Sequence, residues 1–106
     1  MSTCSTHVLD VALGRPAAGI RVHLSDVGLD RLVAEDSTDA DGRVRFAADL
    51  DPGVYTVTFE TGEWFAAADR STFFPAVVLA FIVEADEHYH VPLLLSPYSY
   101  TTYRGS

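Results

Sequence analysis

The chain has 106 residues, 48% of them hydrophobic, and a formal net charge of −8. This length and composition predict one domain that buries roughly 65% of its unfolded surface and folds without disulfides or metal ions. The acidic balance argues against binding to nucleic-acid phosphates or to anionic membranes, so we expect neither partner.

The sequence contains no recognisable signal for export or membrane insertion. Its first ten residues lack a basic segment followed by an apolar stretch. The longest apolar run, residues 76–83, is far shorter than the about 20 residues of a membrane-spanning helix. Cys4 is the single cysteine and cannot form an internal disulfide. We therefore expect a soluble, cytoplasmic protein.

Alternating apolar and polar residues predict eight short strands, at residues 7–11, 20–26, 31–37, 43–46, 54–60, 76–83, 90–95 and 98–103. Turn-forming residues separate them, as in the Asp39-Ala40-Asp41-Gly42 cluster and at Ser96-Pro97. This spacing is typical of an all-β sandwich. One short helix is predicted at residues 62–69, with Thr61 as its N-cap and Glu63 in its first turn.

The predicted strand at residues 76–83 is apolar on both of its alternating faces, whereas the strand at residues 54–60 alternates cleanly. Either the neighbouring helix or a second subunit must cover the additional face. An uncovered apolar edge strand invites aggregation, so we favour a subunit interface and expect an oligomer.

Titratable residues are concentrated near the C-terminus. His88 and His90 share one face of a strand, about 6.5 to 7 Å apart along it. A zinc site would need a third ligand, which His7 could supply, but no further constellation at ligand spacing accompanies them, and we expect no metal. The terminal residues are rich in aromatic and β-branched types, which predicts a docked strand that holds Arg104 and Ser106 in place.

Besides these histidines, arginine residues are candidates for a functional site. Arg43 leaves the tight turn at Asp41-Gly42, a position from which its guanidinium can be aimed, and Arg45 lies on the same face. Taken singly, these arginines and histidines are also typical of solvated or hydrogen-bonded strand residues. Nucleotide-binding loops and nucleophile motifs are absent, and Ser106 as a nucleophile would need a base that the sequence does not reveal.

Three segments together resemble the transthyretin-like 5-hydroxyisourate hydrolases: THVLD with GRPAAG, then Asp41-Gly42-Arg43, then HYHVPLLLSPYSYTTYRGS. The resemblance spans the whole chain, and the closing YRGS is characteristic of the hydrolases. It implies a single domain, residues 1–106, with two four-stranded sheets and a short helix after the fifth strand. It also implies a homotetramer, a dimer of dimers, with active sites at the dimer–dimer interface.

The resemblance implies catalytic roles for His7, Arg43 and His90, and substrate binding by Tyr103, Arg104, Gly105 and Ser106. The implied reaction is cofactor-free opening of 5-hydroxyisourate at its lactam carbonyl, giving 2-oxo-4-hydroxy-4-carboxy-5-ureidoimidazoline in urate degradation. One histidine would activate water, the other would orient it or protonate the leaving nitrogen, and Arg43 would stabilise the oxyanion.

The sequence departs from the family pattern at two places; the first concerns only local turn geometry, and the second keeps an alternative open. Asp39 stands where the family often has asparagine, and SPYSY replaces an SPFGY-type ending, which is nearer to the hormone-carrying transthyretins. The alternative is a carrier of aromatic small molecules without catalysis. The histidines and YRGS favour the hydrolase. A secreted adhesion or starch-binding sandwich would predict a signal peptide, paired cysteines or an aromatic platform, and the sequence shows none of these.

Overall fold

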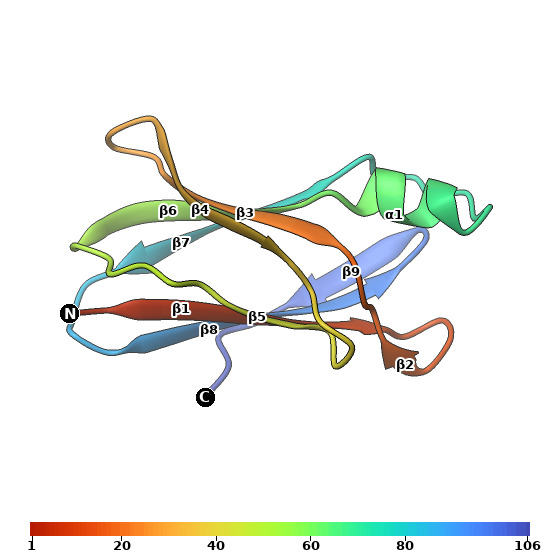
Figure 1. Ribbon diagram of the computed structural model, residues 1–106, viewed down its shortest axis with the longest axis horizontal. Helices are drawn as coiled ribbons and strands as arrows, with labels where there is room; N and C mark the ends of the chain where they lie inside the picture. The colour runs from red at the N-terminus through yellow and green to blue at the C-terminus, as the bar shows by residue number, and fades with distance from the viewer.

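Two β-sheets face each other across a core of buried side chains in the computed structural model, which describes residues 1–106 (Figure 1). The first sheet has the order β2-β1-β8-β9, and β5 also pairs with β1. Its strands are β1 (Thr3–Asp10), β2 (Arg15–Pro16), β5 (Arg43–Arg45), β8 (His88–Ser96) and β9 (Ser99–Thr102). β1 and β8 run parallel, and the other pairs are antiparallel.

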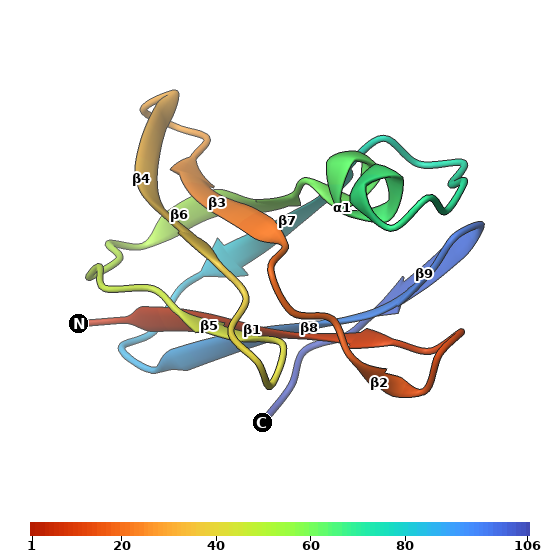
Figure 2. The ribbon, with the colours of Figure 1, turned by 45° about the vertical axis from the view of Figure 1, so that its right-hand side comes forward.

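The second sheet has the order β4-β3-β6-β7, with every pair antiparallel. Its strands are β3 (Arg21–Asp26), β4 (Arg31–Ser37), β6 (Gly53–Phe59) and β7 (Val77–Val83). The helix α1 (Thr61–Ala67) follows β6 and lies at one end of this sheet (Figure 2). It has seven residues, and no helix in the structure is long and apolar enough to cross a membrane.

The predicted all-β sandwich is confirmed, and all eight predicted strands are present: β4 has the predicted ends, and the other seven have shifted ends. The sequence missed β2, so the first sheet has five strands where four were predicted. β2 has two residues, paired with Leu9 and Asp10, and is too short to show alternation. β1 begins at Thr3 instead of His7 because its pairing with β8 extends back to that residue.

Strand alternation places the core between the sheets. In β1, Cys4, Thr6 and Val8 are buried, and in β8 the side chains of Tyr89 and Leu93 are buried. Full burial of a large aliphatic side chain contributes about 1.5 to 3 kcal/mol. Because successive side chains of a strand point to opposite faces, this core also decides which residues of β1 and β8 lie on the outside of the first sheet.

The helix is confirmed, but the prediction of Thr61 as its N-cap is wrong. Glu60 occupies the N-cap position without a side-chain capping bond. Thr61 is fully buried, and its hydroxyl donates to the Phe74 carbonyl at 3.4 Å. Glu63 does lie in the first turn, where it pairs with Arg21. The Thr61 side chain is therefore placed by its packing in the core, and not by the preference of threonine for an N-cap position.

The helix does not cover the second face of β7, so that alternative is wrong. Val78 and Ile82, on the outer face of β7, are 57% and 61% exposed. The helix packs at the end of the sandwich through buried Phe65, and Trp64 donates its indole N–H to the Ala18 carbonyl at 2.7 Å. β7 is an edge strand of its sheet, as β9 is of the other, and its outer apolar face stays open in the single chain.

An ion pair between Arg70 and the buried Asp10 ties the segment after α1 to β1. The Arg70 guanidinium donates to Asp10 at 2.7 Å, and the Asp10 side chain is only 1% exposed. The Leu13 N–H also donates to this carboxylate, at 3.0 Å. Burial alone would raise the pKa of Asp10, but the hydrogen bonds from Arg70 and Leu13, with the charge of Arg70, outweigh it and lower the pKa.

Candidate active site

The outer face of the first sheet gathers the titratable residues predicted from the sequence. Outward positions of β1, β5 and β8 supply what we call the His–Arg face, formed by Ser5, His7, Arg43, Arg45, His88 and His90. Their intervening neighbours, such as Thr6, Val44 and Tyr89, are buried in the core. Three strands distant in sequence therefore present one continuous polar surface.

The strand register brings the three predicted catalytic residues together. His7 is the direct cross-strand partner of Arg43 in the β1–β5 pair. Ser5 is paired with Arg45 on one side and with His90 on the other. With strands about 4.8 Å apart and a rise of about 3.3 Å per residue, the backbones of His7 and His90 lie about 8 Å apart. A small planar molecule can reach all three side chains at this spacing.

The turn at residues 39–42 fixes the backbone from which the Arg43 side chain extends. The Asp39 carboxylate accepts the N–H groups of Asp41 and Arg43, both at 2.9 Å. Gly42 has a φ of 77° and packs so closely on β1 that an added Cβ would overlap the Val8 carbonyl oxygen. The Val8 N–H in turn donates to the Gly42 carbonyl at 2.8 Å. Asp39, a departure from the family pattern, thus makes the acceptor contacts that hold this turn.

The two histidines of β8 share a hydrogen-bond chain that the sequence did not reveal. The Ser5 hydroxyl lies 2.7 Å from His88 Nε2 and 2.7 Å from His90 Nδ1. Thr3 Oγ1 lies 2.6 Å from His88 Nδ1. In the sequence, the only indication that Thr3 and Ser5 belong to the site is that they alternate with His7 along one strand. This indication becomes useful only with the parallel pairing of β1 and β8, which places both residues beside the histidines.

The C-terminal segment docks beside His90, as predicted. The Gly105 N–H donates to the His90 carbonyl at 2.9 Å. A Cβ at position 105 would overlap His90 Cδ2 and would lie 3.2 Å from Cγ, so a residue other than glycine would have to displace the imidazole or the terminal segment. Ser106 is the next residue, and the Tyr103 side chain is 57% exposed.

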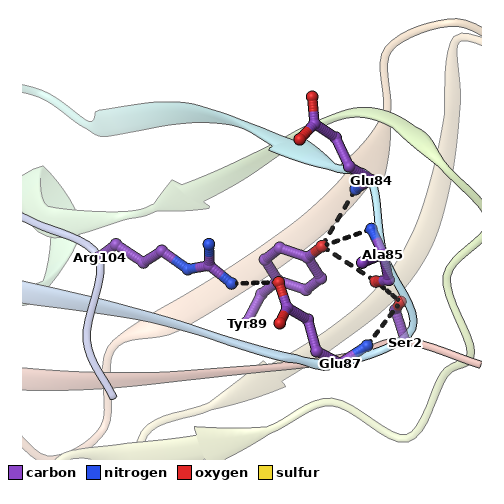
Figure 3. Close-up of polar contacts among 6 residues, drawn as sticks. All are labelled: Ser2, Glu84, Ala85, Glu87, Tyr89 and Arg104. Atoms are coloured by element: carbon purple, nitrogen blue, oxygen red, sulfur yellow. Dashed lines mark hydrogen bonds and ion pairs between the residues drawn. The ribbon is translucent and has the colours of Figure 1, made fainter.

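Arg104 is the one predicted site residue whose charged group turns away from the His–Arg face. Its guanidinium donates to Glu87 at 2.6 Å and lies 4.8 Å from the ring centre of Tyr89 (Figure 3). The Tyr89 hydroxyl is itself held by hydrogen bonds with Glu84 and Ala85. Tyr89 and His90 are neighbours along β8, so their side chains point to opposite faces, and the Arg104 guanidinium lies with Tyr89. The structure therefore brings His7, Arg43, His90 and Gly105 together and leaves the Arg104 guanidinium on the other side of the strand.

Burial and neighbouring charge keep the β8 histidines neutral near pH 7. Burial lowers the pKa of His90, and the charges of His7, His88 and Arg43 lower it further. Burial and the charge of Arg45 lower the pKa of His88. A neutral imidazole can accept a proton, which suits a general base. The structure contains no group of three or more His, Cys, Asp or Glu residues placed to hold a metal ion.

Two cavities meet at His90. The first, of about 300 Å³, lies on the His–Arg face and is lined by Ser5, Thr6, Asp39, Arg43, Val44, Arg45 and His90. The second, of about 360 Å³, runs between β7 and the C-terminal segment and includes Tyr103 and Arg104 with apolar residues of β7. The chemistry is concentrated in the first. The second belongs to the exposed edge, and His7 lies on the open sheet surface outside both.

The sequence model of the HIUase/Transthyretin family matches residues 4–105. The chain belongs to the HIUase/Transthyretin family. It is 47% identical to the 5-hydroxyisourate hydrolase of Caulobacter vibrioides, with both chains covered completely. The structure of Klebsiella pneumoniae 5-hydroxyisourate hydrolase is 44% identical and superposes with a TM-score of 0.92 over the full length of both chains. Sea bream transthyretin in complex with thyroxine is 27% identical, with a TM-score of 0.90 over 96% of this chain and 93% of its own.

Proposed function

We propose that this protein is a 5-hydroxyisourate hydrolase that opens its substrate at the lactam carbonyl to give 2-oxo-4-hydroxy-4-carboxy-5-ureidoimidazoline. The observation that carries the proposal is the convergence of His7, Arg43 and His90 on one sheet face, in a chain whose full-length relatives carry that enzyme name. None of these three residues is a serine, threonine or cysteine nucleophile, whereas two imidazoles and a guanidinium suit attack by water.

In the proposed reaction, one imidazole removes a proton from water as the water oxygen bonds to the lactam carbon. The second imidazole orients the water or protonates the departing ring nitrogen. Arg43 leaves its turn in a fixed direction and donates to the carbonyl oxygen as negative charge develops there, an effect of about 3 kcal/mol per donor. No cofactor takes part in these steps.

The C-terminal residues complete the proposed site. Gly105 packs on the His90 ring, Ser106 follows it, and Tyr103 lines a cavity with His90. We place these three in contact with substrate. Arg104 reaches substrate only if its bond with Glu87 opens, and in the present arrangement it anchors the terminal segment.

The single chain leaves two surfaces that further subunits would cover. The outer face of β7 exposes Val78 and Ile82 at the edge of its sheet, which suits pairing with a second copy. The His–Arg face is likewise open. A homotetramer, built as a dimer of dimers, would enclose it at the dimer–dimer interface. We also place the protein in the cytoplasm, where a reduced Cys4 is expected.

The alternative is a carrier of aromatic small molecules, as the thyroxine complex of sea bream transthyretin illustrates. The identities favour the hydrolase, because the transthyretin is 27% identical and the two hydrolases are 44% and 47% identical. A carrier also has no need for neutral histidines beside an arginine on a polar face.

The test is to generate 5-hydroxyisourate with a urate oxidase and follow its near-ultraviolet decay with and without the protein. The wild type should accelerate decay, and His7→Asn or His90→Asn should lower turnover by about 10² or more. His23→Asn is the matched control, because His23 lies on β3 in the other sheet. Tight binding of the compound without faster decay would favour the carrier.

A further inference from the structure

One continuous hydrogen-bond chain connects His90 to Thr3 across the β1–β8 pair. The contacts run from His90 Nδ1 to Ser5 Oγ at 2.7 Å, from Ser5 Oγ to His88 Nε2 at 2.7 Å, and from His88 Nδ1 to Thr3 Oγ1 at 2.6 Å. The parallel register makes Ser5 the partner of His90, and Thr3 the partner of His88. All four side chains therefore stand side by side on one face.

The Ser5 hydroxyl couples the protonation of the two imidazoles. It has a single proton, so it donates to one ring nitrogen and accepts an N–H from the other. For neutral rings only two arrangements satisfy every contact. In one, His90 Nδ1–H donates to Ser5, Ser5 donates to His88 Nε2, and His88 Nδ1–H donates to Thr3. In the other, every donor is reversed and His90 carries its proton on Nε2.

The His90 ring is held on two edges, so its orientation is defined. Ser5 contacts the Nδ1 edge, and the Gly105 backbone packs against the Cδ2 edge. Nε2 makes no hydrogen bond with the protein and is the nitrogen left for substrate or water. Which of the two arrangements the chain adopts therefore decides whether His90 presents a lone pair or an N–H to the site.

We propose that Ser5 and His88 are positioning residues that hold His90 in the tautomer with an unprotonated Nε2, which makes His90 the general base. The proposal rests on the hydrolase function. The Nε2 lone pair takes a proton from water while the water oxygen bonds to the lactam carbon. The imidazolium then gives this proton to the ring nitrogen as the carbon–nitrogen bond breaks. The sum is addition of one water, and His90 returns to its starting state.

The proposed arrangement needs His88 as the acceptor of the Ser5 proton. Without an acceptor at His88 Nε2, the Ser5 proton is free to turn to His90 Nδ1, which would place the His90 proton on Nε2. In the proposed arrangement, Thr3 accepts the Nδ1–H of His88 and completes the chain. The other charged or titratable groups around His90 are His7 on β1, Arg43 and Arg45 on β5, and Asp39 in the preceding turn, with Tyr103 and Arg104 of the C-terminal segment on the side of the second cavity.

The first measurement uses the resting protein without substrate. Long-range ¹H–¹⁵N spectra of the histidine rings near pH 7.5 distinguish a protonated from an unprotonated ring nitrogen. We expect a protonated Nδ1 and an unprotonated Nε2 at His90 in the wild type. Ser5→Ala and His88→Phe should give mixed tautomers, and Ser5→Thr, which retains the hydroxyl, should restore the wild-type pattern.

The second measurement is steady-state kinetics on the same variants. Ser5→Ala and His88→Phe should lower kcat by about 10- to 100-fold with little change in KM, and Ser5→Thr should recover most of kcat. Ser99→Ala is the matched control, because Ser99 lies on β9 and bonds only with Ser96. Its kcat should equal that of the wild type.

The two proposals fail in different ways. A wild type that does not accelerate 5-hydroxyisourate decay would overturn the hydrolase function, whatever the tautomer. An active wild type with its His90 proton on Nε2 would overturn the positioning role. The positioning role would also be overturned if the wild type is active and Ser5→Ala has the same His90 tautomer and the same kcat as the wild type.

Discussion

Replacing Gly105 by alanine tests whether the docked C-terminus positions the His90 ring. The new Cβ would overlap His90 Cδ2 and lie 3.2 Å from Cγ and 3.4 Å from Cβ. A normal carbon–carbon contact is about 3.5 to 4.0 Å, so the ring or the terminal segment must move by about 1 Å. Gly105 does not have a positive φ, so the substitution adds no backbone strain.

The two ways to relieve this overlap have similar energies. Turning the His90 side chain off its rotamer costs about 0.5 to 1.5 kcal/mol. Releasing the hydrogen bond from the Gly105 N–H to the His90 carbonyl also costs about 0.5 to 1.5 kcal/mol. Both outcomes misplace a group of the proposed site, and a misplacement of about 1 Å typically lowers turnover by about 10²-fold. We therefore expect kcat/KM of Gly105→Ala to fall by about 10²-fold.

The assay is 5-hydroxyisourate decay, with thermal unfolding measured in parallel. Because the change is local and costs about 1 kcal/mol, Tm should fall by no more than about 4 to 8 °C. Gly28→Ala is the control, since its Cβ would meet only Asp26 Oδ1 at an ordinary 3.5 Å, and its kcat/KM should not change. Wild-type kcat/KM in folded Gly105→Ala would refute the argument that this contact positions His90.

Four further outcomes follow from burial and charge. Asp10→Asn should lower the free energy of unfolding by about 3 kcal/mol, because it leaves the Arg70 guanidinium unpaired, and an unchanged denaturant midpoint would contradict this. The pKa of Asp10 is lower in the folded state than in the unfolded chain, so its stabilisation is present above about pH 4 and is lost as pH falls through the folded pKa. A pH series of unfolding curves should therefore show a larger loss of stability in acid for the wild type than for Asp10→Asn, and equal losses would contradict this. Burial raises the pKa of the Cys4 thiol to about 12, so a thiol reagent at pH 8 should label it only on unfolding, and rapid labelling of the native protein would count against the buried position. Because burial and, to a smaller extent, neighbouring charges lower the pKa of His90, kcat/KM should fall on the acid side with a midpoint below about pH 6.5; a midpoint above that value would argue against His90 as the base.

Local sequence pattern was sufficient for much of the site. The spacing of His88 and His90 at the predicted strand of residues 90–95 predicted that they share a face, and the turn at Asp41-Gly42 predicted that Arg43 is held in a fixed direction. The aromatic C-terminus was predicted to dock, and Gly105 does bridge to His90. These features depend on side-chain direction within one strand or one turn, which a few neighbouring residues decide.

The sequence misled where a local preference competed with burial or with a distant partner. Thr61 has the chemistry of an N-cap but is buried beside Phe74. Arg104 is in the expected position along the chain, yet Glu87 and the Tyr89 ring hold its guanidinium away from the His–Arg face. The helix was a possible cover for β7, but its packing at the end of the sandwich leaves Val78 exposed.

By itself, the sequence determined an all-β sandwich, the outward face of each strand and the identity of His7, Arg43 and His90 as candidates. Only the tertiary structure decided that β1 and β8 pair in parallel with Ser5 opposite His90, and so that a serine hydroxyl joins two imidazoles. The physical reason is that side-chain direction repeats every two residues within a strand, whereas the register between strands far apart in sequence depends on how the whole core packs.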